Sequence, residues 1–419
     1  MRLLPSFRFL PVIVVALLHV TAVAQNPLRG KVLAGDTRQP VIAASVFLNN
    51  TSIGAVTNDQ GEFTIQKVPA GRFDLIISSF GYATAKVTIN PGENNTVLEI
   101  LLRPAAEELK EVIVEPYEKD GWETWGSIFL DNFIGTSLFA ADCRIINKEA
   151  LKFRFSKKRN MLRVSADERL VIENRALGYI IKYDLTRFEY DVSDRTFLYQ
   201  GYPFFEEMRS DKKNTLTRWA RNRQDAYDGS IMHFMRALFH RNLVNEKFEI
   251  RKIIVLSQEE KVRVQKNYDK LLSKDPAKSV TVITKNGSTV LKSDTAAMDT
   301  IAYYKQILAS NVGSSVIIDL PMNVDSISFR QDRHTVGLFF TDPLNILYLP
   351  KKKLPEFQKY LPRYTTLVTS EVTAIPNKVI SVFSDGSYFD GLDLIFSGFW
   401  AWSGKICNKL PYDYIPPGK

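Results

Sequence analysis

The first pattern along the chain is a region of short apolar and polar alternations. Between residues 28 and 103, alternating runs are separated by clusters of turn residues such as Pro69-Ala70-Gly71. Alternation with a period of two is typical of half-buried strands, and turn signals at short intervals are typical of a sandwich. The pattern therefore predicts a small all-β domain over residues 27–103. The expected strands include Leu28–Val32, Ala44–Asn49, Phe63–Ile65, Arg72–Ser78, Ala85–Ile89 and Val97–Leu102.

Beyond residue 118 the pattern mixes the strand period with the helix period. Residues 122–133 carry four aromatic side chains at helical spacing. Alternating runs between residues 151 and 199 predict an antiparallel meander. Helical spacing returns over residues 213–243, with a break at Asp228-Gly229, where Ser230 is expected to cap the second helix.

The last part of the chain continues this mixture. Lys247–Leu256 predicts a strand, Gln258–Ser273 and Ala296–Ala309 predict amphipathic helices, and short strand signals recur between residues 337 and 383. Ile395–Lys409 predicts a closing helix. Residues 119–419 are therefore expected to form one larger α+β domain with an antiparallel sheet.

The N-terminus has the features of an export signal. Arg2 and Arg8 precede an apolar run over residues 9–20, and Ala24 ends an A-x-A site before Gln25. This order predicts a secretory signal peptide over residues 1–24, cleaved before Gln25. An uncleaved anchor is the alternative, although the run is short for a membrane span. No later run approaches about 18 apolar residues, so we expect no transmembrane span after cleavage.

Two cysteines, Cys143 and Cys407, lie far apart in the mature sequence. An oxidising compartment would allow a disulfide between them, which would tie the start of the larger domain to its end. Two separate buried thiols are the alternative, and the sequence leaves both open.

Charge is distributed unevenly along the chain. Residues 104–118 hold one lysine and five glutamates and predict an acidic linker. The chain carries a net charge of +9, and its positive excess lies in residues 119–419. A basic body favours an anionic component of the cell envelope as partner. An ordinary solvated basic surface is the alternative, and nucleic acid is not expected as a partner of an exported protein.

Three segments of the first domain carry a resemblance to a known family. PVIAASVFL, GAVTNDQGEFTI and VPAGRFDLIISSFGY resemble the carboxypeptidase-like regulatory domain found in exported proteins of Bacteroidetes type. The resemblance implies a prealbumin-like sandwich that serves as a structural or interaction module, without peptidase activity. It also implies a location in the periplasm or at the periplasmic face of the outer membrane.

Two further resemblances concern the rest of the chain. LKEVIVEP is similar to the segment that follows this module in TonB-dependent receptors. The roughly 300 residues that follow are too few for a plug and a barrel of about 22 strands. NRALGYIIKYDL, YQGYPFFEEM, RNRQDAYDGSIMHFMRALF and LPYDYIPP resemble uncharacterised exported proteins that pair the same module with a region of unknown function.

Catalytic patterns are not evident in the sequence. None of the three mature histidines, His233, His240 and His334, begins the His-x-x-Glu pattern of a zinc carboxypeptidase. No nucleophile elbow or glycine-rich phosphate loop is present. We therefore predict no catalytic residues, no metal and no cofactor. Glu206-Glu207 is interpreted as an exposed helix start.

The best candidate binding site lies in the arginine-rich helical region. Arginine forks together with aromatic faces recognise phosphate, carboxylate or sugar groups. The alternative is a surface helix with a core-facing tryptophan and solvated arginines. The candidate ligand-binding residues are Trp219, Arg221, Arg223, Tyr227, His233 and Arg236.

Two functions follow from these observations. The first is a non-enzymatic binding or assembly protein, with an envelope component or an envelope protein as partner. The second is a cell-envelope hydrolase that acts on glycan or lipid through unidentified catalytic residues.

Overall fold

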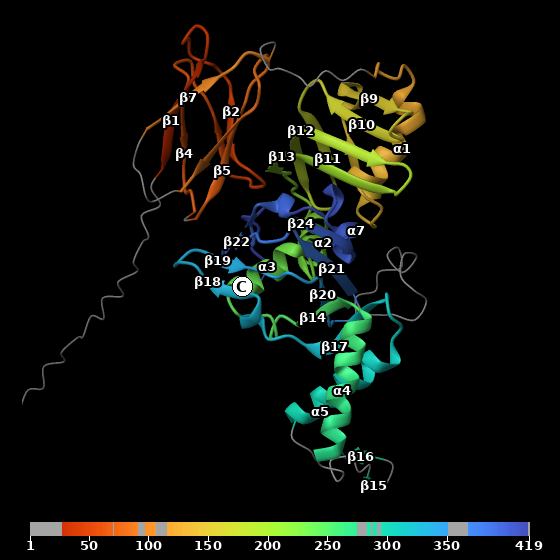
Figure 1. The fold of residues 1–419 in the computed structure, drawn as a ribbon. Coiled ribbons are helices and arrows are strands. Elements are labelled where there is room, and N and C mark those ends of the chain that lie inside the picture. Colours follow the sequence, from red (N-terminus) through yellow and green to blue (C-terminus); the bar gives the residue numbers. More distant parts are fainter. Residues whose placement is uncertain are drawn as a thin grey trace, which may run out of the picture.

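The structure is a computed structural model. It describes residues 27–69, 71–90, 97–105, 115–274, 283–285, 288–290, 295–350 and 368–417. The predicted signal peptide, with its cleavage site between Ala24 and Gln25, lies outside these residues, as does most of the predicted linker. Figure 1 shows a sandwich and a large sheet side by side, with a mixed α/β region beneath them.

The N-terminal domain is a β-sandwich, as predicted. Its sheets have the strand orders β4-β1-β7 and β3-β2-β5-β6. In β4 the side chains of Phe63 and Ile65 are buried while Glu62 and Thr64 are exposed, so the period-two pattern fills the core. The strands are β1 (Leu28–Ala34), β2 (Ser45–Leu48), β3 (Gly54–Val56), β4 (Glu62–Ile65), β5 (Phe73–Ser78), β6 (Ala85–Ile89) and β7 (Leu98–Leu102).

The second region is a six-stranded antiparallel sheet with the order β8-β11-β12-β10-β9, in which β13 also pairs with β12. Helix α1 (Gly121–Phe133) packs on it through Phe129 and Phe133, whose rings contact Phe188 and Tyr183 with centroids 4.8 and 5.0 Å apart. The strands are β8 (Cys143–Ile145), β9 (Leu151–Ser156), β10 (Met161–Ala166), β11 (Leu170–Asn174), β12 (Tyr179–Asp191) and β13 (Thr196–Glu207).

The prediction of a helix start at Glu206-Glu207 was wrong. Strand β13 continues to Glu207 because it pairs with β12 along almost its whole length, from Asp191–Thr196 to Tyr179–Glu207. The long cross-strand ladder outweighs the weak strand signal of the two glutamates.

The third region contains a five-stranded sheet with the order β17-β14-β20-β21-β24 and a small sheet with the order β18-β19-β22-β23. Helices α2 (Lys213–Tyr227), α3 (Ile231–Phe239) and α7 (Phe399–Ser403) accompany them. The strands of both sheets are β14 (Phe248–Val255), β17 (Ser315–Pro321), β18 (Ser328–Arg330), β19 (Val336–Leu338), β20 (Leu344–Tyr348), β21 (Val368–Ala374), β22 (Ile380–Val382), β23 (Tyr388–Phe389) and β24 (Leu394–Gly398).

The predicted closing helix over Ile395–Lys409 was wrong as well. Residues Leu394–Gly398 form β24, and helix α7 that follows has only five residues. Gly398 has φ +67°, a conformation that ends the strand and that favours glycine. Gly404 then follows the helix.

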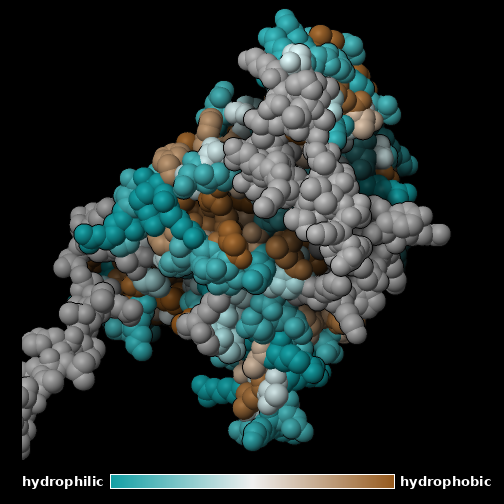
Figure 2. Space-filling model, turned by 90° about the horizontal axis from the view of Figure 1, so that it is seen from below, coloured by the Kyte–Doolittle hydropathy of each residue, from teal (hydrophilic) through white to brown (hydrophobic). Residues whose placement is uncertain are grey.

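Helices α4 (Gln258–Lys274) and α5 (Thr295–Ala309) project from one end of the five-stranded sheet (Figure 1). Strands β15 (Ile283–Lys285) and β16 (Ser288–Val290) lie at the far tip. Seen from this end, most of the coloured part of the surface is hydrophilic, with hydrophobic side chains gathered near the middle (Figure 2). Short 3-10 helices occur at Ala140–Asp142, Lys148–Ala150, Val324–Ser326, Gly391–Asp393 and Ile406–Asn408.

The body is therefore α+β with several antiparallel sheets, as the sequence predicted. In the part of the chain that the structure describes, none of the helices is both long and apolar enough to cross a membrane.

The sandwich is joined to the body through main-chain hydrogen bonds. The turn after β2 reaches the outer edge of β13: Asn50 N–H donates to Pro203 O at 2.8 Å, and Phe205 N–H donates to Thr51 O at 3.0 Å. On the other side, Tyr412 N–H donates to Asn50 O at 2.8 Å. The joint brings the sandwich, the large sheet and the C-terminal segment together beside helices α2 and α3.

Candidate functional site

The candidate site is built on the elbow between α2 and α3. Gly229 has φ +74°, and a Cβ placed there would lie 2.8 Å from Cδ1 of Tyr348. Ser230 caps α3 because its hydroxyl accepts a hydrogen bond from the backbone N–H of His233 at 3.1 Å, as the sequence predicted. The elbow fixes the first turn of α3 and therefore the position of the histidine.

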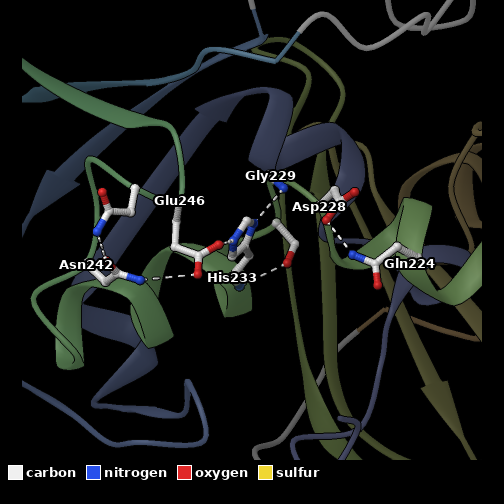
Figure 3. A network of polar contacts seen from close by, with 8 residues as sticks. Gln224, Asp228, Gly229, His233, Asn242 and Glu246 are labelled. Carbon is white, nitrogen blue, oxygen red and sulfur yellow. Dashed lines mark hydrogen bonds and ion pairs between the residues drawn. The ribbon is translucent and has the colours of Figure 1, made fainter. Parts of the chain in front are cut away.

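His233 is buried, with 3% of its surface exposed, and both ring nitrogens are engaged (Figure 3). Gly229 N–H donates to Nδ1 at 3.1 Å. Nε2 lies 2.9 Å from Oε2 of Glu246. Since Nδ1 accepts a hydrogen bond, this network assigns the ring hydrogen to Nε2, which donates to the carboxylate. The pair resembles the base and orienting acid of a catalytic triad, but no ring nitrogen is left to accept a proton from a substrate.

Aromatic rings enclose the histidine. The ring of Tyr227 stacks on it with centroids 4.7 Å apart, and Phe248 and Tyr348 approach edge-on at 4.9 and 5.7 Å. Around this core, Asn242 donates to Oε1 of Glu246 at 3.4 Å (Figure 3). Such a closed polar network inside an aromatic cage favours a single side-chain arrangement.

The two predicted arginines nearest the elbow bind main-chain carbonyls. Nε of Arg236 donates to Asp385 O and its Nη2 donates to Tyr412 O, both at 2.9 Å. Nε of Arg223 donates to Leu177 O at 2.8 Å, and its guanidinium lies 4.0 Å from the ring centroid of Tyr179. Arg223 therefore links α2 to another part of the body, and Arg236 does the same for α3.

Trp219 and Arg221 lie farther along α2 and have different surroundings. Trp219 is buried, and its indole N–H donates to Arg175 O at 2.9 Å. Arg221 is exposed to solvent. The structure thus brings Tyr227, His233 and Arg236 together, places Trp219 and Arg223 beside the loop that precedes β12, and leaves Arg221 on the surface.

The C-terminal segment completes the cluster. Burial raises the pKa of the Asp385 carboxyl, although Ser387 donates two hydrogen bonds to it, from its N–H at 2.9 Å and its hydroxyl at 2.6 Å. Burial also raises the pKa of Tyr414 to about 12. Both groups are therefore held toward their neutral forms beside Arg236.

The two cysteines are free and buried. Asn174, the cross-strand partner of Cys143, donates its side-chain amide to Cys407 O at 2.9 Å, so both cysteines belong to one core. Burial raises the pKa of both thiols, which keeps them protonated and weakly nucleophilic.

The other histidines lie outside this cluster. His240 and His334 are exposed. Within the described residues, no group of three or more histidine, cysteine, aspartate or glutamate side chains is placed to hold a metal ion. The expectation of a protein without metal or cofactor stays a prediction.

Sequence reasoning missed two parts of this region. Glu246 completes the histidine pair, and Asp413 accepts hydrogen bonds from the N–H and hydroxyl of Ser52 in the sandwich. Neither spacing forms a recognised motif.

Sequence reasoning also missed an open groove of about 550 Å³ between β14, β17 and the projecting helices. The lining residues include Lys252, Glu260, Arg263, Tyr303, Leu320 and Asp342.

Comparison with known families identifies the first domain. Residues 28–114 match the model of the CarboxypepD_reg-like domain. This segment of the chain is therefore a carboxypeptidase-like regulatory module, which confirms the resemblance seen in the sequence. The match extends past the predicted boundary at residue 103 into the predicted linker. No curated protein matches the chain.

Proposed function

We propose that this chain is a non-enzymatic exported protein that binds an anionic component of the cell envelope, in the periplasm or at the periplasmic face of the outer membrane. The basic body supplies the binding surface. The regulatory module, joined to β13 and to the C-terminal segment, is a fixed part of the same unit.

The polar groups of the α2–α3 elbow support a structural role for that region. The guanidinium groups of Arg223 and Arg236 bind main-chain carbonyls, and both ring nitrogens of His233 bind protein atoms. Groups that already satisfy buried main-chain acceptors are poorly suited to exchange them for a ligand. A binding surface is therefore sought among exposed cations.

The observation that carries the proposal is a cationic end of the large sheet. The β9–β10 turn and the β12–β13 turn lie side by side, because Val192 N–H donates to Asn160 O at 3.0 Å and the Asn160 amide donates to Ser193 Oγ at 2.8 Å. The β9–β10 turn exposes three basic side chains to solvent, and the β12–β13 turn exposes Arg195 beside Asp194. We define the cationic end as Lys157, Lys158, Arg159 and Arg195.

The chemistry of this end fits phosphate-bearing lipid headgroups. Clustered lysines and arginines near an anionic membrane contribute about 1 kcal/mol each to binding. Lys157 and Lys158 are both exposed to solvent, so their ammonium groups can reach a headgroup.

The test is co-sedimentation of the mature chain with vesicles of phosphatidylglycerol and phosphatidylcholine, against vesicles of phosphatidylcholine alone. A triple variant, Lys157→Gln, Lys158→Gln and Arg159→Gln, should bind the anionic vesicles on the order of 100-fold more weakly, from about 1 kcal/mol per cation. The matched control replaces three other exposed cations, Arg209, Lys212 and Lys213, by Gln and should keep most of the binding. Equal losses in both triple variants would reject the cationic end as the binding surface.

A further inference from the structure

The five-stranded sheet has two end strands, β17 and β24, and the outward main-chain groups of these two strands have different surroundings. At β17, the side chain of Gln306 on α5 covers the outward main chain. Its Nε2 donates to Ile317 O at 2.5 Å, and its Oε1 accepts from Asp319 N–H at 3.1 Å. This amide takes the place of a neighbouring strand, and therefore protects the edge from pairing with another chain.

The outward groups of β24 can be identified from its register. Ile375 N–H donates to Asp393 O at 2.8 Å, which makes this a hydrogen-bonded pair. Since such pairs alternate in antiparallel sheets, Ile395 and Ser397 turn their main-chain groups toward β21. The N–H and C=O groups of Phe396 therefore point away from the sheet, and in the described part of the chain no hydrogen bond reaches them.

The edge of β24 is also accessible. Ile395 is 63% exposed, and Ser397 and Gly398 are exposed as well. The strand reads LIFSG, so it has no charged residue and no proline, and its pairing with β21 shows no bulge. Charged residues, prolines and bulges usually keep an edge strand from pairing with another chain, and β24 has none of them.

We propose that β24 is a self-association edge, at which a second copy of this chain adds its own β24 in antiparallel orientation about a two-fold axis. Phe396 then lies opposite its counterpart, and Ile395 lies opposite Ser397 of the second copy. An isologous contact needs a self-complementary strand, and an uncharged strand brings no like charges together. In this dimer, the five-stranded sheets of the two copies join through β24 into one continuous sheet. The inference does not depend on the proposed lipid binding.

The experiment measures the mass of the mature chain in solution by light scattering and sedimentation over a wide range of protein concentration. The wild type should approach twice the monomer mass as concentration rises. A double variant, Ile395→Lys and Ser397→Lys, should dimerise at least 100-fold more weakly. The control double variant, Val244→Lys and Val262→Lys, adds the same charges at exposed apolar positions away from β24 and should dimerise like the wild type.

Two results would overturn the proposal: a wild-type chain that stays monomeric throughout, or a β24 double variant that dimerises like the control. Hydrogen exchange of the Phe396 amide in the wild type gives a second measurement that needs no substitution. The amide should exchange more slowly as protein concentration rises. Exchange that is independent of concentration would reject pairing at β24 even where the double variant does not fold.

Discussion

At the residue scale, the α2–α3 elbow shows how one glycine positions several groups. The N–H of Gly229 donates to His233 and its carbonyl accepts a hydrogen bond from the indole N–H of Trp400 at 2.8 Å, while its φ of +74° disfavours residues with a side chain. The sequence indicated the break at this position and the capping role of Ser230. It could not indicate Glu246, because the partner of a buried histidine is chosen by how the chain after α3 folds back.

Gly229→Ala should lower the free energy of unfolding by about 2–4 kcal/mol, from the left-handed backbone and from the approach of the new Cβ to Tyr348. Urea unfolding of the purified chain measures this. Gly313→Ala is the matched control, since Gly313 has φ +83° and a Cβ added there would meet nothing within 4 Å, and it should cost only about 1 kcal/mol. Similar losses of unfolding free energy in the two variants would show that the approach of the new Cβ to Tyr348 does not destabilise the protein.

Asp385→Asn tests the buried carboxyl beside Arg236. Burial raises the pKa of Asp385 from its ordinary value of 3.8, so the folded state holds this proton to higher pH than the unfolded state. Its contribution to stability is complete below pH 3.8 and is lost as pH rises through the raised pKa. The variant keeps an oxygen to accept from Ser387 but does not titrate.

The stability of Asp385→Asn relative to the wild type should therefore increase as pH rises from about 4 to about 7. Urea unfolding at several pH values across this range gives the comparison. A difference that stays constant, or that decreases with pH, would contradict the assignment of a raised pKa.

At the element scale, the alternation of residues 28–103 was sufficient to predict the sandwich, since strands such as β4 alternate buried and exposed side chains. Helices α1, α2, α4 and α5 were predicted for the same reason from their periodicity. The two errors, at Glu206-Glu207 and at Ile395–Lys409, concern strands whose identity depends on partners. β13 is held by β12 and by the sandwich, and β24 is held by β21, and these contacts are not visible in local sequence.

The joint between the sandwich and the body was not predicted either, because its main-chain bonds leave no pattern in the sequence and the spacing of Ser52 and Asp413 forms no recognised motif. Asp413→Ala tests it by removing both hydrogen bonds to Ser52. The Ser52 amide should exchange with solvent several-fold faster, with a stability loss of about 1 kcal/mol, since the contact is exposed. Asp342→Ala, which removes an exposed ion pair with Lys252, should leave exchange at Ser52 unchanged. Unchanged exchange in Asp413→Ala would show that this contact does not hold the joint.

At the scale of the whole molecule, the module and the body form one unit, and four exposed cations, Lys157, Lys158, Arg159 and Arg195, gather at the end of the large sheet. Of the candidate ligand-binding residues inferred from sequence, Tyr227, His233 and Arg236 lie together at the elbow, whereas Arg221 is exposed on the surface of α2. Their assignment to a ligand stays a prediction, because His233 and Arg236 are bonded within the protein.

The measurement that tests the account most directly is the salt dependence of binding between the mature chain and vesicles that contain phosphatidylglycerol. If exposed cations at the cationic end carry the interaction, affinity should fall steeply as ionic strength rises, because screening shortens the reach of each charge to about 8 Å at physiological salt. Phosphatidylcholine vesicles should bind little at any salt concentration. Binding that is independent of salt, or equal for both kinds of vesicle, would contradict the proposed function.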